Sequence, residues 1–180
     1  MISLSVFLII ISRSSVMTRK NKIITFILFI IYILLLTWIV IFKTMPYLTH
    51  MSARSLNLEP FKGTAVYHGR YDYKELVGNI LIFVPLGMYI SVVVRKFNLV
   101  AAFVAGFTLS LIYETVQYEL ICGAADVTDV LMNTLGALIG AILYLILKAL
   151  FRKKHIEIIN TLGIVILCIF LAFKMLTTVF

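Results

Sequence analysis

The sequence predicts an all-α protein, a polytopic integral membrane helix bundle with about five transmembrane helices. The chain of 180 residues is 62% apolar and only 13% charged, whereas soluble domains are about half apolar and about a quarter charged. Its mean hydropathy is +1.09. The apolar residues are grouped in runs of about 20, the length that a helix needs to cross a bilayer. These runs use up most of the chain, so no separate soluble domain is expected.

Five apolar runs give the expected crossings. The first run contains Trp38 near its end, where an indole suits the headgroup region of a membrane. The second contains Pro85 and Gly87, which a membrane helix tolerates because neighbouring helices can satisfy the freed backbone groups. We expect helices at about residues 23–42, 76–94, 99–120, 130–151 and 158–180, with a long outer loop over residues 43–75.

The organisation expected is one membrane domain over residues 17–180. Residues 1–16 are interpreted separately, because their apolar stretch Ser3–Ile11 is too short to span and no basic residue precedes it as in a secretory signal. Met17 is followed by a basic stretch and then by the first long apolar run, which is a natural start for an inserted helix. Residues 1–16 are therefore interpreted as a doubtful N-terminal extension.

Basic residues beside the apolar runs set the expected orientation. By the positive-inside rule, loops that are rich in Lys and Arg face the cytoplasm. Three such clusters fall on one side of the expected bundle, at residues 19–22, 95–96 and 148–154. This arrangement places the N-terminus in the cytoplasm and the C-terminus outside. The net charge of +8 is thereby explained by membrane anchoring, and no nucleic-acid partner is expected.

Polar side chains gather at the outer ends of the expected helices. Charged groups in membrane segments are costly and indicate function by default. Glu114 and Gln117 are three residues apart, and Asp129 and Asn133 are four apart, so each pair lies on one helical face. Arg54 of the outer loop is the candidate cation for these carboxylates. The full candidate cluster consists of Arg54, Asn57, Glu59, Asn79, Glu114, Gln117, Asp126, Asp129 and Asn133.

Structural interpretations of the same residues stay open. Asp126 and Asp129 begin an expected helix, where acidic side chains can cap the backbone and complement the helix dipole. The pairing of Arg54 with a carboxylate can be a clasp that serves folding alone. Gly136 and Gly140 continue the face of Asp129 as a GxxxG pattern, which favours close packing of two helices.

The sequence shows no pattern typical of a catalytic or metal site. Cys122 and Cys168 lie in separate segments without a CxxC pattern, and neither a Ser-His-Asp arrangement nor a phosphate-binding glycine loop occurs. We expect no metal, no cofactor and no nucleophile, which argues against an enzyme. An enzyme that modifies envelope lipid or precursor is the first alternative, with Glu114 or Asp129 as general acid or base. A small transporter is the weaker alternative, because no inverted repeat is visible.

Four motifs occur in the order found in the VanZ-like family, and they are specific in combination. They are the loop Arg54–Phe61 and the segments Asn79–Gly87, Glu114–Gln117 and Gly123–Gly136. From Met17 onward, the chain resembles the branch of this family that belongs to glycopeptide resistance clusters. One position departs from the wider family, in which many members have Arg where this chain has Gly123.

The resemblance implies a multi-pass protein of the bacterial cell membrane that lowers susceptibility to teicoplanin-type lipoglycopeptides. These antibiotics bind cell-wall precursor at the outer leaflet, the side on which the polar cluster is expected. The partners implied are membrane lipid and either a lipid-linked cell-wall precursor or the lipoglycopeptide. We expect the polar cluster to hold the polar headgroup of such a ligand while its acyl chains lie along the helices.

Overall fold

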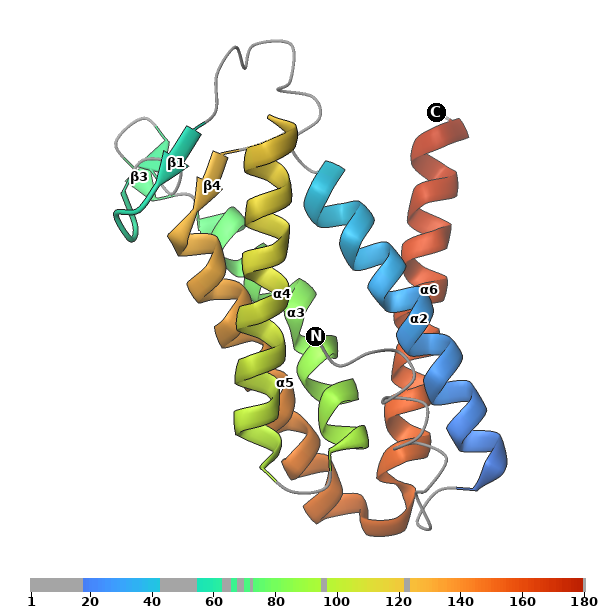
Figure 1. Ribbon diagram of the computed structural model, residues 1–180. Helices are drawn as coiled ribbons and strands as arrows, with labels where there is room; N and C mark the ends of the chain where they lie inside the picture. The colour runs from blue at the N-terminus through green and yellow to red at the C-terminus, as the bar shows by residue number, and fades with distance from the viewer. Residues whose placement is uncertain are drawn as a thin grey trace.

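The computed structural model describes residues 18–42, 55–62, 66–67, 70–71, 73–94, 97–121 and 124–179. Five long helices make up most of this part of the chain (Figure 1). They are α2 (Arg19–Phe42), α3 (Tyr73–Val93), α4 (Asn98–Leu120), α5 (Val127–Phe151) and α6 (His155–Val179). A short 3-10 helix, η2 (Arg152–Lys154), joins α5 to α6. The predicted all-α class is confirmed.

Four helical stretches among the described residues are long and apolar enough to cross a membrane. The last stretch, Val127–Ala172, has 46 residues. At 1.5 Å per residue it would be about 69 Å long, roughly twice the hydrocarbon thickness of a bilayer. The chain reverses its direction at η2, so α5 and α6 run in opposite directions through the bundle (Figure 1). The stretch therefore supplies two crossings, and the bundle has the number of helices that the sequence predicts.

Four of the helices begin three or four residues before the positions expected from hydropathy. They begin at Arg19 instead of residue 23, Tyr73 instead of 76, Val127 instead of 130 and His155 instead of 158. The expected starts were placed at the edge of each apolar run, whereas the first turns contain polar residues such as Lys22, Glu75 and Glu157. A polar first turn can extend the helix beyond the hydrocarbon core of the bilayer. The helical hydrogen bonds still form there, while the polar side chains reach water.

Two small sheets, which the sequence did not predict, lie outside the helices. The strand pairs are β1 (Ser55–Asn57) with β4 (Ala124–Asp126) and β2 (Val66–Tyr67) with β3 (Arg70–Tyr71). The first pair is parallel, and Asn57 lies opposite Asp126. The second pair is antiparallel. Because β4 leads directly into α5, the β1–β4 pairing holds part of the outer loop at the start of that helix.

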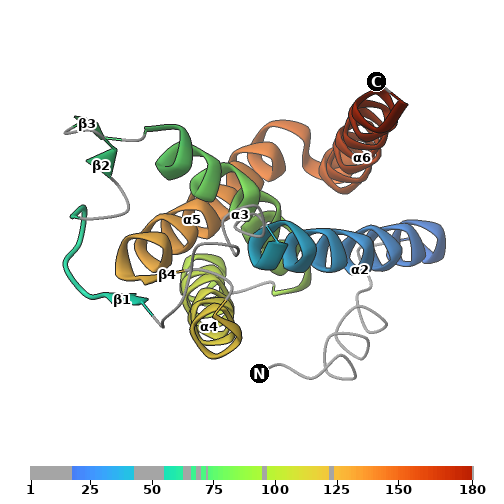
Figure 2. The same cartoon turned by 90° about the horizontal axis from the view of Figure 1, so that it is seen from above.

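The closest packing in the bundle joins α3, α4 and α5, while α2 and α6 lie on one side of α3 (Figure 2). Gly136 and Gly140 of α5 face the backbone of α3. A β-carbon at these two positions would overlap the carbonyl oxygens of Ile80 and Val84. Gly87 of α3 faces the backbone of α5 in the same way. The GxxxG pattern therefore lies at a contact between two helix backbones, as small residues do in membrane proteins.

Pro85 lies inside α3 without ending it. A proline removes one backbone donor from a helix and opens its hydrogen-bond ladder locally. The hydroxyl of Tyr32 in α2 donates a hydrogen bond of 2.8 Å to the carbonyl of Ile82, one turn before Pro85. A neighbouring helix thus supplies a hydrogen-bond donor to α3, close to the backbone N–H that Pro85 lacks.

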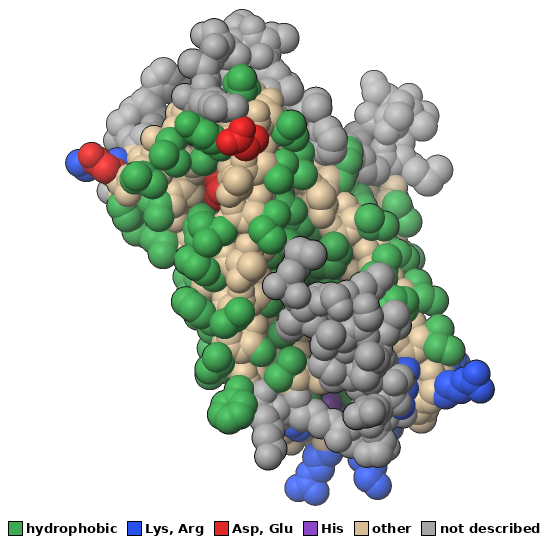
Figure 3. Space-filling view, viewed as in Figure 1, with side chains coloured by type: hydrophobic (Ala, Val, Ile, Leu, Met, Phe, Trp, Pro, Cys, Tyr) green, Lys and Arg blue, Asp and Glu red, His purple; other side chains and the backbone are tan. Residues whose placement is uncertain are grey.

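The two ends of the bundle differ in charge. Lys and Arg side chains gather at the end where α2 begins and η2 lies, here called the basic end (Figure 3). Acidic side chains appear at the opposite end, where α4 ends and α5 begins, here called the acidic end (Figure 3). The positive-inside rule predicts that the basic end faces the cytoplasm. The orientation of the two termini stays a prediction.

Candidate functional site

The candidate site is a buried polar cluster at the acidic end. Its members are Glu114 and Ser110 of α4, Asp126, Asp129 and Asn133 at the start of α5, and Asn79 of α3. All six side chains are buried, from 0% exposed for Ser110 to 9% for Asp129. They meet because the short connection between α4 and α5 makes these helices antiparallel neighbours whose polar ends lie at one level (Figure 1).

Asp126 caps α5 and also ties three segments together. Its Oδ1 accepts a hydrogen bond of 2.7 Å from the backbone N–H of Thr128, which is the usual N-cap contact. Its Oδ2 accepts one of 3.1 Å from the Asn57 amide in β1. Its own backbone N–H donates to Oε2 of Glu114 at 2.9 Å. The capping interpretation of Asp126 is therefore correct, but the same residue joins the outer loop, α4 and α5.

Asp129 lies one turn further along α5 and contacts α3. The Asn79 amide donates a hydrogen bond of 2.5 Å to its Oδ1, between two buried side chains that are 50 residues apart in sequence. Asp129 is thus more than a helix cap, because its carboxylate connects α5 to α3. Asn79 and Asp129 were both expected in the cluster, although the sequence did not predict that they form a pair.

Asn133 forms the deepest part of the cluster. Its amide nitrogen donates a hydrogen bond of 2.8 Å to Oγ of Ser110. Within the described part of the chain, its amide oxygen accepts no hydrogen bond. From Asp126 to Asn133 the cluster extends along α5 for seven residues, about 10 Å. It therefore offers an open hydrogen-bond acceptor about two turns inside the helix bundle.

Ser110 is the member that the sequence interpretation missed. It precedes Glu114 by four residues, so both lie on the same face of α4. That spacing could have identified Ser110 as a neighbour of Glu114 from the sequence. Serine is common in membrane helices, however, and a single hydroxyl gives little reason to choose it over a packing role.

Gln117 and Tyr113 of α4 reach across to α2 instead. The Gln117 amide donates a hydrogen bond of 2.9 Å to the backbone carbonyl of Val40. Val40 lies in the last turn of α2, where carbonyl groups lack partners within the helix. The Tyr113 hydroxyl contacts the Thr37 hydroxyl at 2.8 Å. Gln117 is thus buried near the cluster, and its hydrogen bond to Val40 stabilises the end of a neighbouring helix.

The described part of the outer loop that covers the cluster, residues 55–62, is here called the strap. Its Asn57 points inward to Asp126, and the backbone N–H of Phe61 donates to Oγ1 of Thr128 at 2.9 Å. Phe61 has a φ of 61°, in the left-handed region that most residues avoid. Glu59 points outward and forms an exposed ion pair with Lys62 at 2.6 Å. The structure therefore brings Asn57 to the cluster and leaves Glu59 at the surface.

Arg54, the expected cation, and Gly123 lie outside the described residues. The chemistry of the cluster is that of carboxylates, amides and one serine hydroxyl. Among the residues that the structure describes, no group of three or more His, Cys, Asp or Glu side chains could hold a metal ion. Such an arrangement can bind hydroxyl, amide or amine groups of a ligand through hydrogen bonds, or it can hold the helices in place.

Comparisons with known proteins agree on one family. The family model described as VanZ/LLP1 matches residues 29–148, which contain every described member of the polar cluster. The curated protein "Protein VanZ" of Enterococcus faecium is 32% identical over 148 residues, covering 80% of this chain and 88% of that protein. No solved structure matches this chain. The match to the family model ends before α6, which begins at His155.

Proposed function

Because the chain belongs to the VanZ/LLP1 family, we propose that it lowers the susceptibility of a bacterial cell to teicoplanin-type lipoglycopeptide antibiotics. In this proposal the acidic end faces the outside of the cell. The polar cluster binds the polar headgroup of a lipid-linked cell-wall precursor, or the polar part of the lipoglycopeptide itself. The protein acts as a binding module in the membrane.

The observation that carries the proposal is the depth of the polar cluster. Three carboxylates and two amides lie buried at one end of a bundle whose helices expose many large apolar side chains along their length. Buried polar groups in a membrane protein carry a high cost unless they have partners. At the inner end of the cluster, the Asn133 amide oxygen accepts no hydrogen bond from any described residue. A ligand O–H or N–H group at this place would complete the network.

Glycopeptide ligands fit this chemistry because they are rich in hydroxyl, amide and amine groups. Carboxylate acceptors bind amines and hydroxyls well, and charge-assisted hydrogen bonds are about twice as strong as neutral ones. The same network would also serve as a structural clasp between α3, α4 and α5. The two roles differ in one measurable respect: a clasp fails together with folding, whereas a binding site fails while the fold persists.

The test compares two carboxylate-to-amide substitutions at the acidic end. Asp129→Asn changes the buried cluster, and Glu59→Gln changes an exposed carboxylate of the strap by the same chemistry. We expect Asp129→Asn to lower the teicoplanin minimal inhibitory concentration at least fourfold at unchanged protein amount and thermal stability, and Glu59→Gln to leave it unchanged. Loss of resistance that follows loss of folded protein would show the clasp role alone.

Binding itself is measured on the purified full-length protein in lipid nanodiscs, with teicoplanin and with a lipid-linked precursor as separate probes. We expect one of the two probes to bind, and Asp129→Asn to weaken that probe at least tenfold. If neither probe binds while the lipid and precursor pools of expressing cells change in mass, the protein is an enzyme and the binding proposal is wrong.

The orientation is tested by cysteine labelling of intact cells in a C122S/C168S background. Lys62→Cys lies on the strap at the acidic end, and Lys154→Cys lies in η2 at the basic end. A membrane-impermeant maleimide should label Lys62→Cys from outside and should not reach Lys154→Cys until the cells are opened. The opposite pattern would place the polar cluster on the cytoplasmic side and contradict the proposal.

A further inference from the structure

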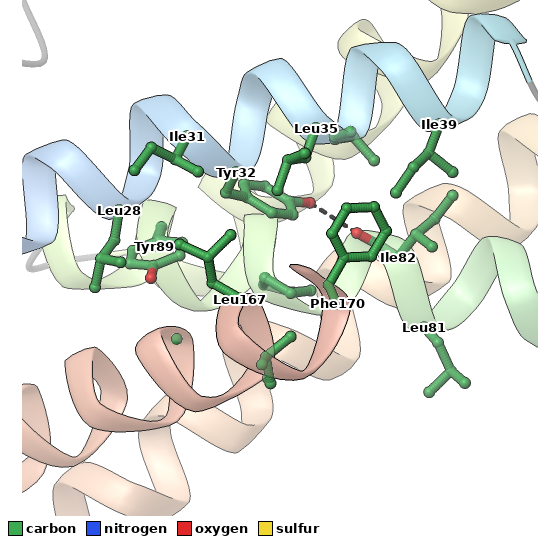
Figure 4. A pocket seen from close by; sticks show the side chains of 14 residues that line it. Leu28, Ile31, Tyr32, Leu35, Ile39, Leu81, Ile82, Tyr89, Leu167 and Phe170 are labelled. Atoms are coloured by element: carbon green, nitrogen blue, oxygen red, sulfur yellow. Dashed lines mark hydrogen bonds between the residues drawn. The ribbon is translucent and has the colours of Figure 1, made fainter. Parts of the chain in front are cut away.

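A second feature of the molecule lies on the other side of α3 from the polar cluster. A groove of about 280 Å³ runs between α2, α3 and α6 (Figure 4). Its walls include Leu35 and Ile39 of α2, Leu81 and Pro85 of α3, and Leu167 and Phe170 of α6. The polar cluster lies on the opposite side of α3, where this helix packs against α4 and α5. The groove is therefore a separate feature and does not depend on the proposed function.

The groove is apolar almost throughout. Two tyrosines are the only polar side chains among the residues that line it, and the hydroxyl of Tyr32 already donates to the carbonyl of Ile82. Tyr89 packs its ring against the ring of Tyr32, with centroids 6.1 Å apart. A polar headgroup would therefore find few partners here, and a hydrocarbon chain would replace no hydrogen bond.

The groove opens sideways at membrane depth. Leu36 and Tyr89 on its inner side are buried, whereas Leu81 and Ile166 at its rim are 62% and 58% exposed. α2 and α3 are each long and apolar enough to span a bilayer, and α6 belongs to the long apolar stretch Val127–Ala172. The medium at its opening is therefore the hydrocarbon of the bilayer and not water.

The groove follows α2 for about three helical turns. Its lining residues in α2 extend from Leu28 to Ile39, about 16 Å along the helix axis. A narrow, linear and apolar chain fits the volume, the length and the lining. It would lie parallel to α2, the direction in which acyl chains lie in a bilayer.

We propose that the groove between α2, α3 and α6 holds one acyl chain of a membrane phospholipid. The bound chain fills the space between the two flanking helices and so completes the packing of α2 and α6 against α3. This makes a lipid a structural component of the protein, beyond the bulk bilayer that surrounds its outer surface.

The test uses the full-length protein in phosphatidylglycerol nanodiscs that contain a small fraction of phosphatidylglycerol with a diazirine midway along one acyl chain. After illumination, peptide mass spectrometry maps the labelled residues. We expect groove residues such as Leu35 and Leu167 to be labelled at least fivefold more than Leu34. Leu34 is the control because it precedes Leu35 on the same helix, is 65% exposed and does not line the groove.

A matched pair of variants then fills or spares the groove. Leu35→Trp places an indole in the groove and should reduce labelling of Leu167 at least fivefold, whereas Leu34→Trp should leave it unchanged. Circular dichroism and thermal unfolding check that both variants fold. If Leu35→Trp does not fold, Ile39→Phe fills the same groove with a smaller addition and should give the same loss.

Three outcomes would overturn the proposal. Equal labelling of Leu34 and the groove residues would show only bulk lipid at the surface. Cross-links between two protein copies through groove residues would assign the groove to a second copy of this chain. Displacement of the photolabel by teicoplanin, or by the lipid-linked precursor, at stoichiometric amounts would assign it to the acyl chain of that ligand. Asp129→Asn should leave the labelling unchanged, so failure of the proposed function is seen separately.

Discussion

The contact between α3 and α5 and the contact of α2 with α6 use different means to hold helices together. In the first, glycines at positions 87, 136 and 140 bring two backbones into direct contact. Near the acidic end the same helices are joined by the buried pair Asn79 and Asp129. In the second, the buried pair Thr25 and Asn160 makes a hydrogen bond of 2.9 Å near the basic end, and an apolar groove separates the helices further along.

This difference teaches how stability is distributed in a membrane bundle. Lipid tails are as apolar as the helices, so burial of apolar surface does little to drive helices together. Close backbone contact and buried hydrogen bonds must supply the association instead. The α3–α5 contact has both, and it carries the polar cluster. On the α2–α6 side, hydrogen bonds near the basic end join Thr25 to Asn160 and Asn21 to Glu157, and Gly163 of α6 meets side chains instead of a helix backbone. A space that a lipid chain suits lies further along, so we expect this side to be the more easily separated part.

The largest effect is expected at the glycine contact. Gly136→Ala places a methyl group against the carbonyl of Ile80, which is backbone and cannot turn aside. We expect it to lower the free energy of unfolding in detergent micelles by about 3 kcal/mol, the upper part of the range for overpacking. Gly78→Ala is the control, because its β-carbon would meet no atom within 4 Å. That variant should be neutral or up to about 1 kcal/mol more stable, because alanine favours the helix. Equal effects of the two variants would contradict the close-contact interpretation.

A second, smaller effect is expected for the polar pair of the same contact. In a double-mutant cycle, Asn79→Ala and Asp129→Ala should show a coupling of about 1.5 kcal/mol, as for two buried groups in direct contact. The measurement is unfolding of the single and double variants under the same conditions. Additive effects, with no coupling, would mean that the two side chains do not depend on each other for stability.

The smallest effect is expected on the α2–α6 side. The cycle of Thr25→Val and Asn160→Leu should give a coupling of about 0.6 kcal/mol, the average for hydrogen bonds between membrane helices. A value equal to that of the Asn79 and Asp129 pair would remove the contrast between the two regions. Repeating the measurement after exhaustive delipidation should further destabilise the α2–α6 side if a bound acyl chain supports it.

The sequence predicted the helices well because their signal is local. A run of about 20 apolar residues has one stable form in a bilayer, so the number of helices follows from counting such runs. The first polar turns were missed for the same reason, since hydropathy marks the edge of the hydrocarbon and not the end of the helix. The gathering of polar side chains at one end also follows from the order of the helices, because neighbours joined by a short turn meet at their polar ends.

The particular pairs could not be predicted from the sequence. Asp129 pairs with Asn79 because the rotation of α3 against α5 is set by where their glycines meet, and a single sequence does not give that rotation. Gln117 bonds to the backbone carbonyl of Val40, a partner with no signal in the side-chain sequence. The groove likewise depends on the tilts of α2 and α6, which packing sets and hydropathy does not.

The parallel pairing of β1 with β4 has a consequence for how the protein is made. Asn57 and Asp126, which lie opposite each other in this pair, are 69 residues apart in the chain. At a synthesis rate of about 5–20 residues per second, β1 leaves the ribosome roughly 3 to 14 seconds before its partner strand exists. During that time α3 and α4 emerge between the two strands. The strap can therefore close only after the start of α5 has emerged, which makes it one of the last parts of the acidic end to take its final shape.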